Sequence, residues 1–480
     1  MIVDIEFFDN KEELKISYID RNRDRKFAKF NFKPYMWVEV PENARAFDPE
    51  YTSVGHKKVK KIASQRASAR VIREEIFLNI KPNNPELFEP NIPKVHFFDI
   101  ETDTTNKWPD AESATERVNT IAVVNENGDA FLLTLKTLTK AQLNNIKKKI
   151  DKHFEKFNTD CTLSYKKFEN EYQLLEFFVT GILPKVTVLT GWNAVRYDWQ
   201  YIYNRCARIG IDIRRASPTG GLSYGGPYDW RVPSHMIVID YLDLFKKYDY
   251  SVKVKESDSL DWVSNAVLKL QKIKYNGSLT NLYDNEFEQY CFYNIVDTLL
   301  VLHIHQQLDC LTGHLMLSYL ASTRIGEADS PVALTESLIQ EDLYRLKKMV
   351  FAKLLKPPVR EDYGGGWVKE PKPNMYQYVA CFDFSSLYPT IKRMFNISPE
   401  SYIGLFNPDT NIITNRDGET LEFDPAVHLK TAINTVYSRE DSIVRNKLTL
   451  LYTLRKDTQK KSFQMSKIVH SAKNRLKQLV

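Results

Sequence analysis

The stretch His96-Phe97-Phe98-Asp99-Ile100-Glu101-Thr102 constrains the chain more than any other, because it places two carboxylates inside a short apolar run. On a β-strand, residues i and i+2 point to the same face, so Asp99 and Glu101 project together while Phe98 and Ile100 pack behind them. Adjacent carboxylates repel each other, and burying them is costly unless a cation lies between them. The alternative is a half-exposed strand with a polar outer face, and partner carboxylates elsewhere in the chain would decide between the two.

Two later segments supply such partners. Asp198 opens a predicted helix just after Gly191-Trp192-Asn193, and Tyr293 and Asp297 stand four residues apart on one face of the helix predicted for residues 286–303. Hard oxygen ligands select Mg²⁺ or Mn²⁺, and a pair of such ions roughly 3.5–4 Å apart supports phosphodiester hydrolysis. Each acid alone is more typical of a surface residue or a helix cap. The ordered set within one α/β segment favours a two-metal site.

Composition limits the classes of protein to which the chain can belong. Its 480 residues predict two to four modules, and 43% hydrophobic with 27% charged residues is ordinary for a globular protein. No apolar run is long enough to span a bilayer, and no signal peptide is evident, so no membrane partner is expected. The cysteines are scattered without a CxxC pair, which predicts reduced thiols and neither a disulfide framework nor a zinc site: Cys161, Cys206, Cys291, Cys310 and Cys381.

Positive charge is concentrated at one end of the chain. The net charge is +6, yet residues 441–480 alone contain ten Lys or Arg and two Asp, which leaves the other 440 residues slightly negative. Such a concentration is expected of an element that meets phosphates, although a solvated basic helix is the usual explanation of a run taken alone.

The pattern of elements predicts an α/β multidomain protein. Residues 1–93 are β-rich, with a basic helix predicted for residues 57–73, and residues 94–309 alternate between strands and helices. Residues 310 to about 360 are predicted to be helical, residues 378–384 are predicted to form an apolar strand, and residues 441–480 are predicted to form the basic helix.

The three acidic segments together resemble the proofreading exonuclease motifs of family B DNA polymerases. They are Phe98-Asp99-Ile100-Glu101-Thr102, Gly191-Trp192-Asn193 with Tyr197-Asp198, and Tyr293-Asn294-Ile295-Val296-Asp297. A tyrosine four residues before the last aspartate matches the tyrosine-type DEDD 3′–5′ exonucleases. The resemblance implies a ribonuclease H-like domain with a mixed sheet, in which Asp99, Glu101, Asp198 and Asp297 hold two metal ions and Tyr293 positions water. Residues 225–235 would be the hairpin that helps move the primer end.

A second motif resembles the palm domain of the same family. Asp383-Phe384-Ser385-Ser386-Leu387-Tyr388-Pro389 follows the predicted strand, where an aspartate can hold Mg²⁺ and a following turn can offer backbone N–H groups to a triphosphate. A buried strand that ends in a turn is the alternative. The resemblance implies that Asp383 is a metal ligand, that Ser385, Ser386 and Leu387 line the nucleotide site, and that Tyr388 stacks under the sugar.

Neighbouring segments extend this resemblance. Residues 363–366 with 368–371 resemble the linker between exonuclease and palm, and Asn396-Ile397-Ser398-Pro399-Glu400 resembles the polymerases of T-even-type bacteriophages. In the basic end, Arg455 would contact the triphosphate at the start of the fingers helix. A lysine is expected four residues after that arginine, but Gln459 stands there, so Lys460 or its neighbour would have to substitute.

The resemblance implies four domains: an N-terminal domain of residues 1–93 completed by about 310–356, an exonuclease domain of 94–309, a partial palm of 357–440, and the start of the fingers helix in 441–480. The motifs K-x-x-x-N-S-x-Y-G and Y-x-D-T-D, which complete the fingers and the palm, are absent from the sequence. Asp383 alone cannot hold both metals of a polymerase site, so we expect no synthesis by these residues by themselves.

Three functions are therefore weighed. The favoured one is the N-terminal subunit or fragment of a split DNA polymerase, with a second polypeptide carrying the remaining palm, fingers and thumb. The alternatives are a stand-alone 3′–5′ exonuclease or inactive remnant of an interrupted gene, and a DNA-binding scaffold with dead sites. The resemblance implies primer-template and single-stranded DNA, dNTP and a sliding clamp as further partners, in the cytoplasm of an infected bacterial host.

Overall fold

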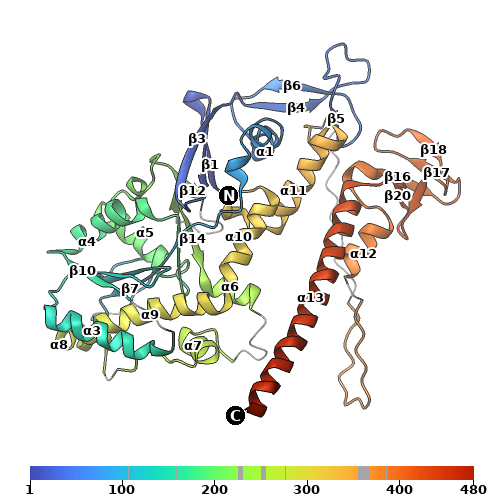
Figure 1. Ribbon diagram of the computed structural model, residues 1–480. Coiled ribbons are helices and arrows are strands. Elements are labelled where there is room, and N and C mark those ends of the chain that lie inside the picture. Colours follow the sequence, from blue (N-terminus) through green and yellow to red (C-terminus); the bar gives the residue numbers. More distant parts are fainter. Residues whose placement is uncertain are drawn as a thin grey trace. The chain divides into compact units, whose positions relative to one another are not determined.

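The structure is a computed structural model that describes residues 1–105, 108–157, 161–224, 231–249, 256–275, 277–354, 368–384 and 386–479 (Figure 1). They form two compact units: the first contains Met1–Lys33 and Asn79–Leu338, and the second contains Pro34–Leu78 and Ile339–Val480. The predicted linker at 363–366, the hairpin residues 225–230 and Ser385 lie outside the described residues. The division into four domains stays a prediction.

A six-stranded mixed sheet forms the centre of the first unit, in the order β10-β9-β8-β7-β11-β14. Its strands are β7 (Val95–Thr102), β8 (Val118–Asn125), β9 (Ala130–Thr134), β10 (Leu163–Lys167), β11 (Val188–Gly191) and β14 (Ile237–Asp240). β7 pairs antiparallel with β8 and parallel with β11, and β14 continues the parallel edge. This mixed sheet, with helices on both faces, confirms the predicted ribonuclease H-like fold.

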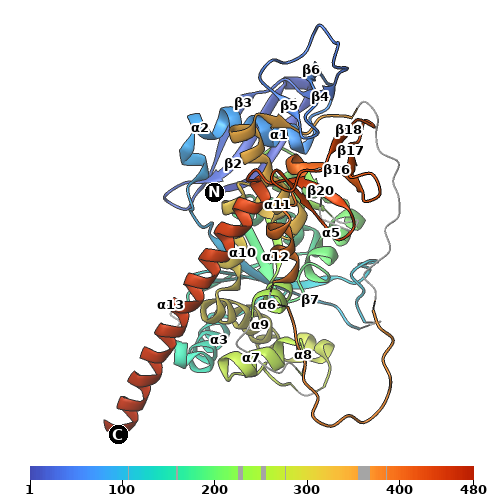
Figure 2. The ribbon, with the colours of Figure 1, turned by 90° about the vertical axis from the view of Figure 1, so that its right-hand side faces the viewer.

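Alternating side chains of β7 divide the core of the first unit into two layers. Phe97 packs toward one layer of helices, whereas Phe98 packs toward the other. The Phe97 layer contains α3 (Lys140–His153), α6 (Tyr241–Tyr248), α7 (Leu260–Leu268) and α9 (Phe287–Leu308), and Figure 2 shows α3, α7 and α8 (Leu279–Asn285) grouped beside α9. The Phe98 layer contains α4 (Glu171–Phe177) and α5 (Asp198–Ile209).

The N-terminal strands of the first unit form a separate antiparallel sheet, as the β-rich pattern predicts. Its strands are β1 (Ile2–Phe8), β2 (Glu13–Ile19) and β3 (Arg25–Asn31). Arg25 ties this sheet to the central domain, because its guanidinium donates hydrogen bonds to the carbonyls of Pro184, Val186 and His235. A short hairpin of β12 (Leu222–Tyr224) and β13 (Arg231–Pro233) precedes His235, and α10 (Cys310–Ala321) and α11 (Pro331–Asp342) follow α9.

The second unit contains a small N-terminal pair of strands, a five-stranded sheet and, among its helices, those that carry the palm and fingers motifs. The pair is β4 (Tyr35–Glu39) with β6 (Val59–Ala63), and the larger sheet has the order β18-β17-β16-β20-β19: β16 (Tyr402–Asn407), β17 (Ile412–Thr414), β18 (Thr420–Glu422), β19 (His428–Lys430) and β20 (Thr435–Ser438). The helices of the palm and fingers motifs are α12 (Leu387–Met394) and α13 (Ile443–Leu479). None of the helices in the described ranges combines the length and apolarity needed to cross a membrane.

Two predicted elements of this unit are wrong. Residues 57–73 form β6 and then only the start of helix α1 (Ala69–Glu75), because Ser68 caps that helix at its N-terminus through the Val71 N–H. Residues 378–384 are irregular and exposed instead of forming a strand, with Phe382 91% exposed. An apolar run becomes a strand only where a neighbouring strand accepts its backbone hydrogen bonds, and no described strand pairs with these residues.

Candidate functional site

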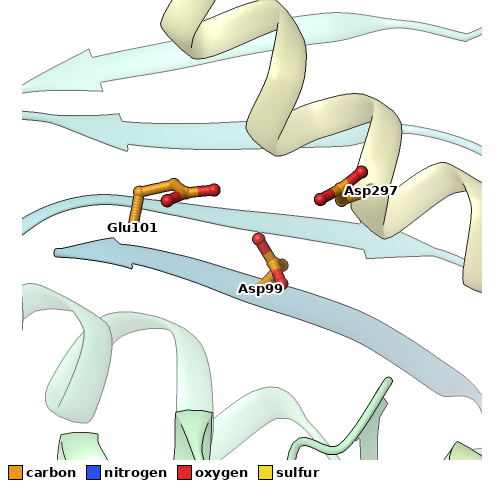
Figure 3. Close-up of side chains that lie close together, drawn as sticks. All are labelled: Asp99, Glu101 and Asp297. Carbon is orange, nitrogen blue, oxygen red and sulfur yellow. The ribbon is translucent and has the colours of Figure 1, made fainter. Parts of the chain in front are cut away.

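Three of the predicted acids converge between β7 and α9. Asp99 and Glu101 leave β7 on the face that α9 covers, and Asp297 comes from α9 (Figure 3). One carboxylate oxygen from each residue lies within 4.8 Å of the others, and the three carboxylates point toward a shared space. Glu101 and Asp297 are buried, whereas Asp99 is partly exposed. The i, i+2 spacing on the strand therefore produces the paired carboxylates that the sequence predicts.

Asp198, the fourth acid, reaches β7 at the edge that faces β11. β11 pairs with β7 only as far as Phe97, so the β7 edge beyond that residue is open. Asp198, the first residue of α5, fills this opening, and its Oδ1 accepts a hydrogen bond of 3.2 Å from the Ile100 N–H. The acid is buried and is outside the group of three, yet it lies near enough for the charge of Asp99 to raise its pKa.

The electrostatics of the cluster are those of a site built for cations. Burial, reinforced by the charge of Asp297, raises the pKa of Asp99 to about 7. Burial and the charge of Asp99 raise the pKa of Glu101 well above its usual range, and the same two causes act on Asp198. Carboxylates in such surroundings bind protons or divalent cations readily, because either relieves their mutual repulsion.

Lys272 is a site residue that sequence reasoning missed. Its Nζ lies 2.5 Å from Asp297 Oδ2 and 5.2 Å from the centre of the Tyr293 ring. Burial lowers the pKa of Lys272, but the charge of Asp297, its hydrogen bond to Lys272 and the neighbouring Tyr293 and Asp99 together outweigh burial, and the net pKa is raised. The residue lies in an irregular loop after α7, where no spacing relates it to the acids, so only the folded chain shows the pairing.

Tyr293 lies beside the cluster as predicted. Its side chain is half-buried, one helical turn before Asp297, and the two side chains are within hydrogen-bonding reach. Burial and the charge of Asp297 raise the pKa of the Tyr293 hydroxyl, which therefore keeps its proton at neutral pH. The ring packs edge-on against Tyr275, with 5.4 Å between the ring centres.

A second residue that sequence reasoning missed is Asn294, which is fully buried in α9. Its Nδ2 donates a hydrogen bond of 2.7 Å to Asp99 Oδ2, and its Oδ1 accepts one of 3.2 Å from the Thr120 hydroxyl. This chain of hydrogen bonds fixes the direction of the Asp99 carboxylate. The residue stands inside the quoted motif, but nothing in the spacing shows that its side chain turns toward β7.

The palm motif lies in the second unit and is only partly assembled. Asp383 is exposed and belongs to no group of three metal-ligating side chains among the described residues. Arg455 does reach the motif, because its Nη1 donates a hydrogen bond of 3.4 Å to the Ser386 hydroxyl. Leu387 and Tyr388 begin α12, and the Tyr388 side chain is 79% exposed.

The segment Asn396–Glu400 has a clear structural role in the second unit. Asn396 Nδ2 donates hydrogen bonds to the carbonyls of Ser438 and Glu440, which precede α13. The Glu400 carboxylate accepts a hydrogen bond of 2.7 Å from the Ile443 N–H, at the first residue of α13. A carboxylate at a helix N-terminus satisfies a free N–H and favours the helix dipole, so this segment fixes the start of the basic helix.

Two family profiles match the chain. The profile described as "DNA polymerase family B, exonuclease domain" matches residues 25–263, and "DNA polymerase family B" matches residues 331–478. The DNA-directed DNA polymerase of Escherichia phage RB69 is 27% identical over 481 residues, which cover 92% of this chain and 52% of the relative. The DNA-directed DNA polymerase of Enterobacteria phage T4 is 31% identical over 256 residues, covering 50% of this chain and 28% of the relative.

A cellular relative shows the same similarity. DNA polymerase 1 of Saccharolobus solfataricus is 24% identical over 377 residues, covering 73% of this chain and 40% of the relative. The chain thus spans about half the length of the phage RB69 protein and a smaller share of the other two. Asp99, Glu101 and Asp198 lie within the exonuclease match, and Asp297 lies after it. Asp383 lies within the second match.

Proposed function

The chain belongs to the family B DNA polymerases, and from this premise we propose that its first unit is a 3′–5′ exonuclease for DNA that uses two divalent metal ions. The observation that carries the proposal is the convergence of carboxylate oxygens of Asp99, Glu101 and Asp297 within 4.8 Å of one another, with Asp198 at the adjoining edge of β7. A group of buried acids is unfavourable in a protein without a function for it, because each charge loses its hydration.

The residues present fit a divalent ion. Asp297 Oδ1 is buried and has no hydrogen-bond partner among the described residues, which is the state expected of an oxygen reserved for a ligand. Carboxylate oxygens are the ligands that Mg²⁺ and Mn²⁺ prefer. Asp99, Glu101 and Asp297 would hold one ion, and Asp99 with Asp198 would hold the second. When bound, the pair would stabilise the attacking water and the leaving oxygen of a phosphodiester.

The other side chains of the site have separate tasks. The protonated Tyr293 hydroxyl lies next to Asp297 and is half-buried. It can therefore donate a hydrogen bond to the attacking water or accept one from it. The Lys272 ammonium neutralises one oxygen of Asp297 and leaves the other for a ligand. Asn294 holds Asp99 in the direction of the cluster.

For synthesis, we propose that residues 357–480 supply the first part of a palm and the start of the fingers, with dNTP and primer-template DNA as substrates. Support comes from the contact of Arg455 with Ser386 and from the exposed apolar side chains of residues 375–384, which suit a sheet completed by further strands. The remaining palm, fingers and thumb would come from polypeptide outside this sequence, and we propose a second chain as their source. The predicted four-domain division, a sliding clamp and the cytoplasm of a phage-infected bacterium belong to the same proposal.

An exonuclease assay tests the first part. The purified chain with Mg²⁺ is expected to shorten a 5′-labelled single-stranded oligonucleotide from its 3′ end. Asp99→Ala combined with Glu101→Ala should lower the rate by more than about 100-fold, since changing even the outer-shell partners of a bound metal costs 10–100-fold. Asp383→Ala, in the second unit, is the matched control and should keep the full rate. A double variant that still degrades DNA would overturn the proposal.

A primer-extension assay tests the second part. The chain alone is expected to incorporate no nucleotide, and adding a polypeptide that carries the two missing motifs should start incorporation. Asp383→Ala should then abolish synthesis and leave the nuclease unchanged. Incorporation by this chain alone would contradict the proposal that the polymerase site is shared.

A further inference from the structure

Asp240, at the end of β14, forms hydrogen bonds with the segment that leads to Asp198. It is buried, and its neighbour across the parallel β11–β14 pair is Gly191. Its Oδ1 accepts a hydrogen bond of 3.0 Å from the Asn193 N–H, and its Oδ2 accepts one of 3.3 Å from the Val195 N–H. The same Oδ1 also accepts a hydrogen bond of 3.0 Å from the Leu242 N–H and so caps the N-terminus of α6.

The segment that Asp240 holds, residues 192–197, is tightly constrained. Asn193 has a positive φ of 61°, and a Cβ on Gly191 would lie 2.5 Å from the Phe98 carbonyl oxygen. Backbone N–H groups in such a turn need acceptors once they are buried, and two of them find the Asp240 carboxylate. Arg196, within the same segment, forms ion pairs with both neighbouring acids. Its Nη1 lies 3.5 Å from Asp240 Oδ2, and its Nη2 lies 2.8 Å from Asp243 Oδ2.

The first turn of α5 is joined to this segment by its backbone: the Trp199 N–H donates a hydrogen bond of 2.7 Å to the Ala194 carbonyl, and the Tyr197 N–H donates one of 3.1 Å to the Asn193 carbonyl. Its N-cap, Tyr197, makes no side-chain capping hydrogen bond. The helix is anchored by the fully buried side chains of Trp199, which directly follows Asp198, and of Tyr201 and Ile202. The position of Asp198 therefore depends on the preceding segment as well as on the buried Trp199 beside it. A small shift of this turn would break the hydrogen bond of 3.2 Å from Ile100 to Asp198.

We infer that Asp240 is a positioning residue of the nuclease site, whose carboxylate holds the backbone at Asn193 and Val195 so that Asp198 stays at the open edge of β7, bonded to the Ile100 N–H and near Asp99. This rests on the proposed exonuclease function. The alternative is that Asp240 has only a structural role, as the N-cap of helix α6 through the Leu242 N–H. The two alternatives differ in what they predict for metal binding, because the cap of α6 has no bearing on the fourth acid.

Two variants and two controls distinguish these alternatives. Asp240→Ala removes both acceptor oxygens and with them the three backbone hydrogen bonds, whereas Asp240→Asn keeps the shape and the Oδ1 acceptor but turns an amide donor toward the Val195 N–H. Thr139→Ala removes the capping box of α3 and serves as a control for lost helix capping, and Asp243→Asn removes a partner of Arg196 without touching the backbone of the segment.

Exonuclease kinetics on a single-stranded oligonucleotide give the first readout. Asp240→Ala should lower kcat by roughly 100-fold, and Asp240→Asn by about tenfold, with KM within about twofold, since a displacement of about 1 Å at a reacting site has this effect. Thr139→Ala and Asp243→Asn should stay within about twofold of the wild type. If kcat in both Asp240 variants equals that of Thr139→Ala, the inference is overturned.

Mn²⁺ binding, followed by electron paramagnetic resonance without DNA, gives the second readout. The wild type should bind two ions, and Asp240→Asn should weaken the second by at least about tenfold and leave the first unchanged. Two unchanged ions in Asp240→Asn would also overturn the inference. Failure of the proposed function has a different signature: the variant with both Asp99→Ala and Glu101→Ala would keep its nuclease activity, whatever happens at Asp240.

Discussion

The ammonium nitrogen of Lys272 lies 2.5 Å from Oδ2 of Asp297, while Oδ1 of the same carboxylate is buried without a hydrogen-bond partner among the described residues. One oxygen is thus neutralised by the protein itself and the other is open to a ligand. This division explains how a cluster of buried acids is tolerated before a divalent ion binds, because a single internal cation offsets part of the repulsion.

Replacing Lys272 should show that the stability of the acidic cluster depends on this internal cation. Lys272→Met leaves the Asp297 carboxylate without a counter-charge, which should lower the free energy of unfolding in EDTA by about 3–5 kcal/mol. Urea unfolding measures this, and saturating Mn²⁺ should restore part of the loss by replacing the missing charge. Lys274→Met, at an exposed lysine two residues away, is the control and should change stability by less than about 0.5 kcal/mol. Equal stability of both variants would contradict the structural pairing.

Glu101→Gln should separate stability from activity. Glu101 is buried and its pKa is raised by burial and by Asp99, so a neutral amide of the same shape removes an unfavourable charge. In EDTA the variant should be more stable than the wild type by about 1–2 kcal/mol, although its nuclease activity is lost. Differential scanning calorimetry should show a Tm that rises with Mn²⁺ only in the wild type. Glu112→Gln, at an exposed site, should leave both properties unchanged. A Glu101→Gln protein less stable than wild type in EDTA would count against the electrostatic account.

Gly191→Ala should disturb the site through the backbone. The new Cβ would lie 2.5 Å from the Phe98 carbonyl oxygen and 3.0 Å from Ala194 Cβ, so β7 or the segment before Asp198 must move. We expect a loss of about 1–3 kcal/mol in unfolding free energy and a lower exonuclease rate, measured by urea unfolding and oligonucleotide degradation. Gly313→Ala, inside α10 with nothing within 4 Å of its Cβ, should instead be stabilising by about 0.5–1 kcal/mol. Unchanged stability in Gly191→Ala would contradict the close contact between Gly191 and the Phe98 carbonyl.

Acid should destabilise the first unit through His303. This side chain packs between Phe154 and Phe157, and burial lowers its pKa from 6.5 to about 4. Below pH 6.5 the unfolded chain takes up a proton that the folded chain does not, so stability is retained above that pH and falls as the pH drops toward about 4. The fall attributable to this residue is up to about 3 kcal/mol, at roughly 1.4 kcal/mol per pH unit.

The measurement compares urea unfolding at pH 7.5 and pH 5. His303→Gln should lose less stability over this interval than the wild type, because glutamine does not titrate there. His56→Gln replaces an exposed histidine in the second unit and should behave as the wild type does. A His303→Gln variant with the same loss as the wild type would reject the assignment.

Much of the exonuclease unit follows from local sequence. The alternation in β7 and the spacing of Tyr293 and Asp297 in α9 depend only on the geometry of a strand and of a helix. The strand predicted for residues 378–384 in the second unit is wrong because local sequence does not supply a partner strand. An apolar run forms a strand only where such a partner is present. Local patterns specify which face a side chain occupies, and pairing partners come from elsewhere.

The sequence by itself determined the family and the mixed α/β character of the exonuclease region, and it proposed the four acids, because these reside in short motifs with fixed spacing. Only the tertiary structure decided that Lys272 pairs with Asp297, that Asn294 orients Asp99 and that Asp240 holds the segment before Asp198. The physical reason is that these contacts join segments far apart along the chain, and a hydrogen bond or ion pair forms only where folding brings its two partners within about 3–4 Å.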